Sequence, residues 1–410
     1  MSELTYLEKL LDGVKVEWQT LGKVLKRTKG TKITAGQMKA LHKDNAPLKI
    51  FAGGKTVAFV DFKDIPEKDI NREPSIIVKS RGIIEFEYYD KPFSHKNEMW
   101  SYHSNNDAIS IKYIYYFLKI NEGYFQKIGG KMQMPQIATP DTDKFEVPIP
   151  CPDNPEKSLA IQSEIVRILD KFTALTAELT AELNMRKKQY NYYRDQLLSF
   201  DEEQEKPIYL EKLLDGVEVE WKLLGDASFF EIANNGRKPV KSSLRIAGKT
   251  PYYGANNIQD YVDGYTHDGE YVLIAEDGSA SLENYSIQYA TGKFWANNHV
   301  HVVRGKTRVN SRFLFHYLHI VNFIPFLTGG VRAKLTKGQL IEISVPIPCP
   351  DNTEKSLAIQ AEIVRILDKF DTLTNSITEG LPREIELRQK QYEYYRDLLF
   401  SFPKPETVSN

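Results

Sequence analysis

Residues 147–172 read VPIPCPDNPEKSLAIQSEIVRILDKF, and residues 345–370 read VPIPCPDNTEKSLAIQAEIVRILDKF. The two stretches differ at only two positions, where Pro155 corresponds to Thr353 and Ser163 corresponds to Ala361. Near-identity over this length indicates an internal duplication. A duplication constrains the architecture of the whole chain, so it is considered before the individual helices and strands.

The duplication extends beyond this stretch in both directions. Residues 186–195, RKKQYNYYRD, return at 388–397 as RQKQYEYYRD, and the head YLEKLLDGV at 6–14 returns at 209–217. The repeat therefore has a period of about 200 residues and consists of a constant head, a variable body and a constant helix. It divides the chain into an N-terminal conserved segment (1–23), a first body (24–146), a central conserved region with a long helix (147–204), a repeated head (205–225), a second body (226–344) and a C-terminal conserved region with a long helix (345–410).

Both copies of the helix carry a seam in which residues recur in steps of three and four, a pattern typical of a helix that packs along another helix. The first seam consists of Ile165, Leu169, Phe172, Thr176, Leu179, Leu183, Arg186, Tyr190, Tyr193 and Leu197, and the second begins with Ile363, Leu367, Phe370, Thr374, Ile377 and Leu381. We expect the two helices to pair with each other. The alternative is two separate surface helices on two separate domains.

The ends and the continuity of these helices can also be predicted. Asp153 with Glu156, and Asp351 with Glu354, have the spacing of a capping box. In the second copy the seam resumes at Ile385 after one extra step of four residues, and Gly380 and Pro382 lie at this step. The sequence therefore predicts a kink or a break there.

The two bodies have unlike sequences but the same order of landmarks. Each contains β-like runs, such as 75–79 and 271–275, and then an aromatic helical segment, 112–119 or 312–319. Each then passes through a Gly-Gly loop into the proline-rich entry of the long helix. This pattern favours one fold adapted to read two different things. The alternative, duplication followed by drift, does not explain why the helices remained almost identical.

Charge is segregated along the chain although the net charge is only −1. Residues 24–144 carry 20 Lys and Arg against 14 Asp and Glu, and residues 226–344 carry 13 against 10. The bodies are therefore basic and the remaining segments acidic, which favours two modules that face a polyanion.

Cys151 and Cys349 occupy equivalent positions and form no Cys-x-x-Cys motif. The first residues lack the features of a signal peptide, and no run is apolar enough for a membrane span, so we expect a cytoplasmic protein without a membrane partner.

Two short motifs suggest enzyme chemistry without meeting its requirements. Residues 53–56 and 248–250 end like a phosphate-binding loop but lack its first glycine, so we interpret both as turns. His299 and His301 could begin a metal site, but no third ligand has a suitable spacing, and alternation on a strand explains them better. We therefore expect no catalytic residues and no metal.

The helix repeats, the LEKLLDGV heads and the PIPCP entries closely resemble the specificity subunit of type I restriction–modification enzymes. The tandem tetrapeptide of Thr176, Ala177, Glu178 and Leu179 followed by Thr180, Ala181, Glu182 and Leu183 resembles that of the IC family. The resemblance covers the whole chain, but the second helix lacks the tandem repeat.

The resemblance implies an α+β protein in which two α/β target-recognition domains are joined by two long antiparallel coiled-coil helices. Each domain would read one half of a split site on double-stranded DNA. The helices would set the spacer between the half-sites and dock two modification (methyltransferase) subunits, through which restriction (endonuclease/translocase) subunits would join. Partner subunits would bind S-adenosylmethionine, ATP and Mg²⁺, and this chain would bind no cofactor.

Base reading should fall to Arg, Lys, Asn and Gln side chains on loops, because these side chains present hydrogen-bonding groups to base edges. The candidates in the first body are Lys79, Arg81, Lys96, Asn97, Lys131 and Gln133, and those in the second are Asn256, Asn257, Asn297, Asn298, Arg332 and Lys334. The chain is thus predicted to be a non-catalytic DNA sequence-recognition subunit. The alternatives are a stand-alone enzyme acting on DNA and a coiled-coil scaffold without a nucleic-acid role.

Overall fold

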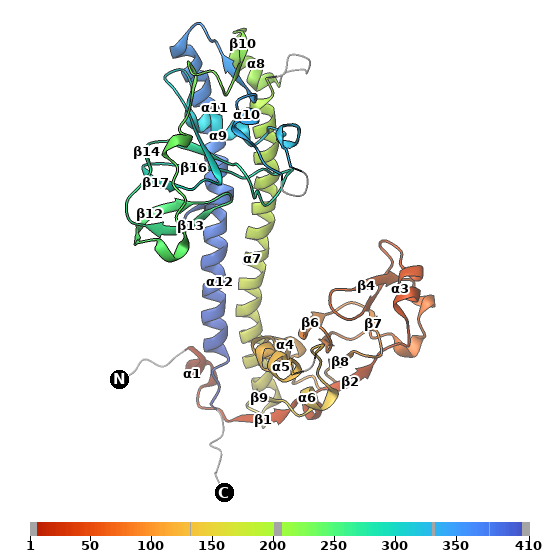
Figure 1. The fold of residues 1–410 in the computed structure, drawn as a ribbon. Coiled ribbons are helices and arrows are strands. Elements are labelled where there is room, and N and C mark those ends of the chain that lie inside the picture. Colours follow the sequence, from red (N-terminus) through yellow and green to blue (C-terminus); the bar gives the residue numbers. More distant parts are fainter. Residues whose placement is uncertain (1–5, 132, 201–206, 330–332, 377, 404–410) are drawn as a thin grey trace, which may run out of the picture. The chain divides into compact units, whose positions relative to one another are not determined.

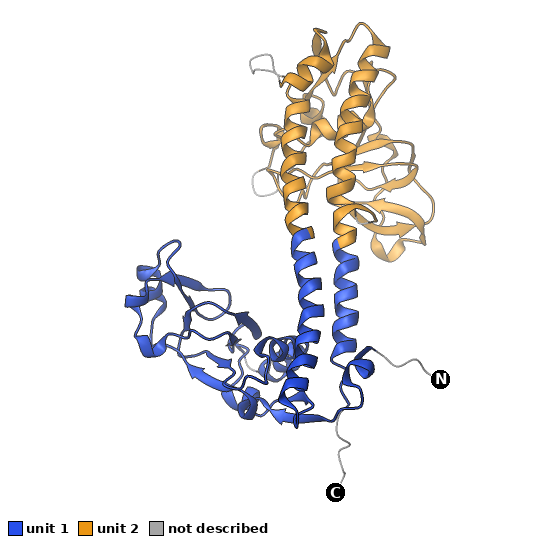
Figure 2. Cartoon of the chain, turned by 180° about the vertical axis from the view of Figure 1, so that it is seen from behind, with its two compact units in different colours: residues 1–178, 385–410 blue, residues 179–384 orange. Residues whose placement is uncertain are grey.

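The computed structural model describes residues 6–131, 133–200, 207–329, 333–376 and 378–403. Its contacts divide the chain into two units, shown in Figure 2. Unit 1 comprises residues 1–178 and 385–410, and unit 2 comprises residues 179–384. Each unit therefore contains one variable body together with parts of both long helices.

Unit 1 is built on a four-stranded antiparallel sheet of order β2-β8-β5-β6, and a second sheet of order β4-β3-β7 lies in the same body. Its elements, most of which are labelled in Figure 1, are α1 (Tyr6–Leu11), β1 (Val16–Thr20), α2 (Leu21–Val24), β2 (Lys26–Lys29), α3 (Ala35–Leu41), β3 (Leu48–Phe51), β4 (Val57–Val60), β5 (Ser75–Lys79), β6 (Glu85–Tyr89), β7 (Phe93–His95), β8 (Trp100–His103), α4 (Ile111–Ile120), α5 (Glu122–Gly129), α6 (Thr139–Asp143), β9 (Glu146–Pro150), the first part of α7 (Pro155–Leu198) and the last part of α12 (Gly380–Leu399).

Unit 2 repeats the first of these sheets as β11-β18-β15-β16 and adds a sheet of order β13-β12-β17-β14. Its elements are the rest of α7, α8 (Ile208–Leu214), β10 (Val219–Leu223), β11 (Phe230–Ile232), β12 (Ala247–Tyr253), β13 (Ile258–Val262), β14 (His267–Asp268), β15 (Tyr271–Ala275), β16 (Ile287–Ala290), β17 (Lys293–Ala296), β18 (Val300–Gly305), α9 (Ser311–Leu318), α10 (Lys337–Leu340), β19 (Ser344–Pro348), α11 (Thr353–Asn375) and the start of α12.

The predicted strands 75–79 and 271–275 are the buried central strands β5 and β15, and the aromatic helical segments are α4 and α9. The prediction of a turn at 53–56 is confirmed, because Ala52 N donates to Thr56 O across it. The prediction of a turn at 248–250 is wrong, because these residues lie in β12 at a bulge between Ala247 and Thr250.

The predicted capping boxes are wrong by one residue in both repeats. The Asn154 side chain accepts from Lys157 N at 3.0 Å, and the Asn352 side chain accepts from Lys355 N at 3.0 Å. Asparagine is a strong helix N-cap, and Asp153 and Asp351 lie one position too early to accept these bonds. The helices therefore begin at Pro155 and Thr353, and proline is favoured at this first position.

Within each unit the long helices pack against one another as the seam predicts. In unit 1 the ring of Phe172 stacks on Tyr395 with centroids 5.4 Å apart, and Ile165 and Leu169 are fully buried. In unit 2 Phe370 stacks on Tyr193 at 5.5 Å and on Tyr190 at 6.3 Å. Burying an aliphatic side chain such as that of Ile165 or Leu169 contributes about 1.5–3 kcal/mol to the stability of the fold. The prediction of paired helices is therefore confirmed in each unit, apart from Ile377, which lies outside the described residues.

The second long helix is interrupted where the stutter predicts. α11 ends at Asn375 and α12 begins at Gly380, which has a φ of +78°. A side chain at this φ would be strained, and a Cβ there would lie 2.4 Å from the carbonyl oxygen of Thr372. Pro382 follows in the first turn of α12, where its missing N–H costs nothing.

A buried glutamine on each constant helix forms hydrogen bonds with main-chain atoms of the body. Gln162 accepts from Ser110 N at 2.9 Å and donates to Ala108 O at 3.0 Å, and Gln360 makes the same bonds to Asn310 N and Arg308 O. Both glutamines have an exposed fraction of 0%. Because the contacts involve only the backbone of the body, they are insensitive to its side chains.

A carboxylate eight residues further along, about two helical turns, adds a contact to the aromatic helix of the body. Asp170 accepts from Lys112 at 2.7 Å and from Tyr116 at 2.6 Å. Asp368 accepts from Arg312 and His316, both at 2.7 Å. Burial raises the pKa of Asp368, but its bonds to His316 and Arg312 outweigh burial and lower the pKa. One constant residue therefore binds unlike partners at corresponding positions.

Each body's core is also completed by the end of a long helix from the other repeat. Leu399, Phe400 and Phe402 belong to the core of unit 1, where the Phe400 ring lies 5.5 Å from that of Tyr113. Leu197, Leu198 and Phe200 belong to the core of unit 2. The repeats are thus interlocked, and neither body forms its core from its own repeat alone.

We predict that Gln162→Leu and Gln360→Leu each lower the free energy of unfolding by about 2–4 kcal/mol, because each leaves two buried main-chain groups without partners. Gln389→Leu, at an exposed position on α12, is the control and should change stability by less than about 0.5 kcal/mol. Thermal and denaturant unfolding measure both. Equal melting temperatures for the three variants would contradict the docking role of the glutamines.

Candidate nucleic-acid interface

Three segments of unit 1 meet at the end of the central strand β5. Ser80 Oγ donates to Glu98 O at 2.7 Å, and Ser80 O accepts from Ile137 N at 3.0 Å. Arg81 forms a β-bridge with Gln136, and Gly82 N donates to Pro135 O at 2.9 Å. Residues 80–82, 96–98, 129–131 and 133–137 therefore form one surface, which we call loop cluster 1.

Loop cluster 1 brings together most of the candidates from the first body. Arg81, Asn97, Lys131 and Gln133 are exposed on it. Lys96 pairs with Glu98 at 2.6 Å. Burial raises the pKa of Glu98, but the bond from Lys96, with a smaller contribution from the charge of Arg81, lowers it overall. The Asn97 amide faces the carbonyls of Gly30 and Thr31.

Lys79 differs from the other candidates. It is the last residue of β5 rather than a loop residue, and it is only 7% exposed. Its Nζ lies 2.6 Å from Glu85 and 2.8 Å from Glu87, both on the neighbouring strand β6. Burial lowers the pKa of Lys79, but the two glutamates outweigh burial and raise it. The expectation that Lys79 lies on a loop is wrong, because strand pairing turns its side chain toward these carboxylates.

The same frame recurs at the end of β15 in unit 2. Glu276 N donates to His299 O at 2.9 Å, and Leu335 N donates to Glu276 O at 2.8 Å. Asp277 forms a β-bridge with Lys334. Asn256 adds a further loop, because its Nδ2 donates to Gly278 O at 2.8 Å. We call this surface, formed by residues 254–257, 276–280, 297–299, 328–329 and 333–335, loop cluster 2.

Loop cluster 2 holds the described candidates of the second body in different states. Asn257 and Asn298 are exposed, whereas Asn297 is only 4% exposed and its Oδ1 accepts from His299 N at 2.8 Å. Lys334 Nζ lies 2.9 Å from Glu276. Arg332 lies outside the described residues. Asn297 therefore shapes the turn from within, while Asn257 and Asn298 are accessible.

Sequence reasoning missed the charged residues that support this surface. Glu276 pairs with Arg237 at 2.6 Å, and Arg237 also donates to Val300 O at 2.8 Å. Burial raises the pKa of Glu276, but Arg237 and Lys334 lower it overall. Asp277 accepts from His299 Nδ1 at 2.5 Å. No local motif marks Arg237, Glu276 or Asp277, because their partners lie 22 to 63 residues away in sequence.

The two histidines considered for a metal site serve different purposes. His301 is buried, its Nδ1 lies 2.9 Å from Asn234 Nδ2, and its Nε2 lies 2.7 Å from Leu335 O. Burial lowers the pKa of His301. His299 is exposed and pairs with Asp277. Among the described residues, no group of three or more His, Cys, Asp or Glu could hold a metal ion.

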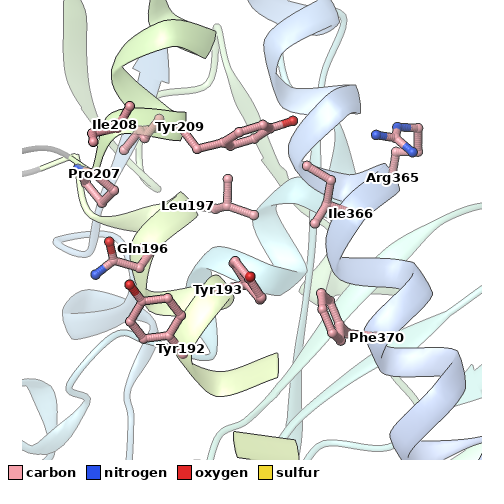
Figure 3. Close-up of a pocket in the computed structure, with 11 residues that line it drawn as sticks. Tyr192, Tyr193, Gln196, Leu197, Pro207, Ile208, Tyr209, Arg365, Ile366 and Phe370 are labelled. Carbon is pink, nitrogen blue, oxygen red and sulfur yellow. The ribbon is translucent and has the colours of Figure 1, made fainter. Parts of the chain in front are cut away.

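Unit 2 also has a groove, formed by its long helices and α8 rather than by the body. A groove of about 760 Å³ is lined by Tyr192, Tyr193, Gln196, Leu197, Pro207, Ile208, Tyr209, Leu210, Arg365, Ile366 and Phe370. Figure 3 shows the stacked rings of Tyr193 on α7 and Phe370 on α11 side by side in its lining. Ile208 is 72% exposed at the rim, so the groove offers apolar surface to solvent.

Part of the groove is duplicated in unit 1. In unit 2 Tyr209 donates to Glu362 at 3.1 Å, and Arg365 forms two bonds of 2.7 Å to the same carboxylate. In unit 1 Tyr6 donates to Glu164 at 3.0 Å, and Arg167 forms two bonds of 2.6 Å. The bonds from Arg167, with a smaller one from Tyr6, lower the pKa of Glu164 to about 2.

Comparison with known proteins identifies the family. The family model described as "Type I restriction modification DNA specificity domain" matches residues 15–186 and 218–387. The chain belongs to the family of type I restriction enzyme specificity subunits. The duplication seen in the sequence is thus two copies of the family's domain, and the predictions of the family, the fold class and a DNA sequence-recognition function are confirmed.

Individual relatives agree with the assignment to the specificity subunits. The chain is 40% identical to the Escherichia coli EcoR124I/EcoR124II specificity subunit over 100% of both chains, and 37% identical to the E. coli EcoprrI specificity subunit over 92% of this chain and 93% of that one. A putative specificity subunit of Haemophilus influenzae is 61% identical, but the match spans 49% of this chain and 51% of that protein. The fold of the Mycoplasma genitalium S subunit superposes with a TM-score of 0.64 at 17% identity, covering 96% of this chain and 98% of that one. None of the helices in the described parts of this specificity subunit has the length and apolarity that a membrane crossing requires.

We predict that Lys79→Met lowers the free energy of unfolding by roughly 1–3 kcal/mol, because it removes the cation that the partly buried Glu85 and Glu87 share. Glu87 then keeps only its longer contact with Lys49, at 3.3 Å. Lys55→Met, on the exposed turn of the same body, is the control and should stay within about 0.5 kcal/mol. Chemical denaturation measures the difference.

The loss should depend on pH. The pKa of Glu87 is lowered in the folded state, because its interactions with Lys79, together with smaller ones with Lys49, outweigh burial. The ion pair therefore stabilises the fold above the unfolded carboxyl's pKa and is lost as pH falls through the lower folded value. The gap between Lys79→Met and the wild type should narrow in acid. A gap that is constant from neutral to acid pH would contradict the ion-pair account.

Proposed function

We propose that loop cluster 1 and loop cluster 2 each read one half of a split site on double-stranded DNA. The observation that carries this proposal is the repetition of one main-chain frame that presents different side chains in the two units. Basic and amide side chains, such as Arg81, Lys131 and Asn298, suit contacts with phosphates and base edges. The excess of positive charge in both bodies supports the same function.

The docking of the bodies explains how one protein could carry two unlike readers. Gln162 and Gln360 hold the main chain of the body, and Asp170 and Asp368 accept from whichever donors α4 and α9 present. A body can therefore change the side chains of its reading surface without losing its contacts with the constant helix. Modules that bind the helix through their backbone should be exchangeable between specificity subunits.

We propose that the chemistry belongs to partner subunits, with this chain itself non-catalytic and cytoplasmic. Two modification subunits would methylate the DNA with S-adenosylmethionine, and restriction subunits joined through them would use ATP and Mg²⁺. The duplication supports two copies of one partner, since each unit offers the same tyrosine–glutamate–arginine cluster, at Tyr209 and at Tyr6.

We assign the groove on α7 and α11 as the seat of one modification subunit. Its floor is apolar, with Leu197, Ile366 and Phe370, and its rim carries the exposed aromatic side chains of Tyr192 and Tyr209. Apolar surface of this kind rimmed by polar groups marks protein–protein contacts. Unit 1 offers the corresponding residues Tyr394, Tyr395 and Phe172 for a second copy.

The modular reading predicts that replacing residues 226–344 by the body of another specificity subunit transplants one half-site and leaves the other unchanged. Methylome sequencing of a host that expresses the chimera with the modification subunit measures this. Specificity that does not move with the body would contradict the proposal. Methylation by the purified chain alone would favour a stand-alone enzyme, and failure of the complex to bind any duplex would favour a scaffold.

The docking proposal predicts that Ile208→Asp or Tyr192→Asp reduces the complex from two modification subunits to one, because the corresponding residues of unit 1 stay intact. Tyr394→Asp should do the same from the other unit, and combining it with Ile208→Asp should remove both partners. Native mass spectrometry gives the stoichiometry. Leu244→Asp, which is equally exposed but lies on the body of unit 2, is the control. Two bound partners in the double variant would refute the assignment.

A further inference from the structure

The two loop clusters share one position whose backbone is the same and whose chemistry is opposite. Arg81 and Asp277 each form the β-bridge to the last loop of the cluster, with Gln136 and with Lys334. Each is followed by a glycine with positive φ, +82° at Gly82 and +71° at Gly278. The residue before each accepts a main-chain bond from that loop, Ser80 O from Ile137 N and Glu276 O from Leu335 N. Arg81 and Asp277 are therefore equivalent.

The side chains at this position have opposite hydrogen-bonding character. The Arg81 guanidinium is exposed and can only donate. The Asp277 carboxylate can only accept, and it already accepts from His299 Nδ1 at 2.5 Å. With Nδ1–H directed at Asp277, the Nε2 of a neutral His299 is an acceptor as well. One unit thus offers donors at the point where the other offers acceptors.

A general contact with DNA phosphate does not explain this exchange. Both bodies would face the same polyanion, so a phosphate-binding position should be positive in both, and Asp277 is negative. A position that reads bases has no such constraint, because base edges present acceptors at guanine and amino donors at cytosine and adenine. The turn is also rigid, since main-chain bonds and a β-bridge hold it at Ser80 and Arg81 and at Glu276 and Asp277. Rigid support of this kind is what direct readout needs.

We propose that Arg81 and Asp277 are base-reading residues that give the two half-sites opposite polarity at one position. Arg81 donates to O6 and N7 of a guanine, and Asp277 with His299 accepts from the amino group of a cytosine or an adenine. This assignment rests on the proposed function, because it presupposes that both loop clusters face duplex DNA.

The test is methylome sequencing of a host that lacks restriction activity and expresses the chain with its modification subunit. A split motif from the wild-type chain establishes the proposed function first, and its absence would refute that function rather than this assignment. In Arg81→Ala and Arg81→Lys, one guanine of one half-site should become degenerate, with a loss of preference of roughly ten- to hundredfold. In Asp277→Asn and Asp277→Ala, one cytosine or adenine of the other half-site should relax.

The controls separate base reading from phosphate contact and from misfolding. Arg81→Lys keeps the charge but loses the planar fork, so it should relax the guanine while the melting temperature stays unchanged. Lys55→Ala and Asp263→Ala, exposed in the same two bodies, should leave both half-sites intact. A uniform loss of methylation with an unchanged motif would assign Arg81 to phosphate and overturn the proposal. Unchanged motifs in all four Arg81 and Asp277 variants would also overturn it.

Discussion

The pairing of the duplicated helices is the constraint on which the rest of the structure depends. Neither helix is apolar on all sides, and each buries its seam only by packing on the other within a unit, as Phe172 does on Tyr395 and Phe370 on Tyr193. The end of each helix then enters the core of a body from the other repeat, through Phe400 in unit 1 and Phe200 in unit 2. Pairing and body folding are therefore coupled, and a change that separates the helices also removes part of each core.

The near-identity of the helices has a physical reason once their contacts are known. Gln162 and Gln360 satisfy main-chain groups of the bodies, and replacing either by a residue that cannot form these bonds leaves two buried backbone atoms without partners. The side chains of the bodies, in contrast, are free to vary, because the bodies contact these glutamines through backbone atoms. One chain can thus keep its scaffold almost unchanged while Arg81 and Asp277 diverge to opposite charge on the same turn.

Much of this arrangement could be predicted from the sequence. The internal repeat predicted the architecture, and the three- and four-residue spacing predicted the seam between the long helices. The break before Gly380 was predicted from a stutter next to glycine and proline. Contacts between distant segments could not be predicted in this way. Lys79 is buried because strand β6 places Glu85 and Glu87 beside it, and nothing in its local sequence indicates that pairing. The predicted N-caps were wrong by one residue, because asparagine and aspartate both cap helices. Only the backbone geometry determines which of two adjacent residues is the cap.

We infer that the paired helices, rather than the bodies, set the distance between the two half-sites. The boundary between the units falls between Glu178 and Leu179, inside the tandem tetrapeptide of residues 176–183. Inserting one further Thr-Ala-Glu-Leu unit lengthens a helix by about 6 Å, which lies between one and two base-pair rises of about 3.4 Å. Methylome sequencing of the insertion variant is the most direct test. We expect the gap between the two half-sites to grow by one or two base pairs while both half-sites stay unchanged. An unchanged gap would show that the helices do not set this distance.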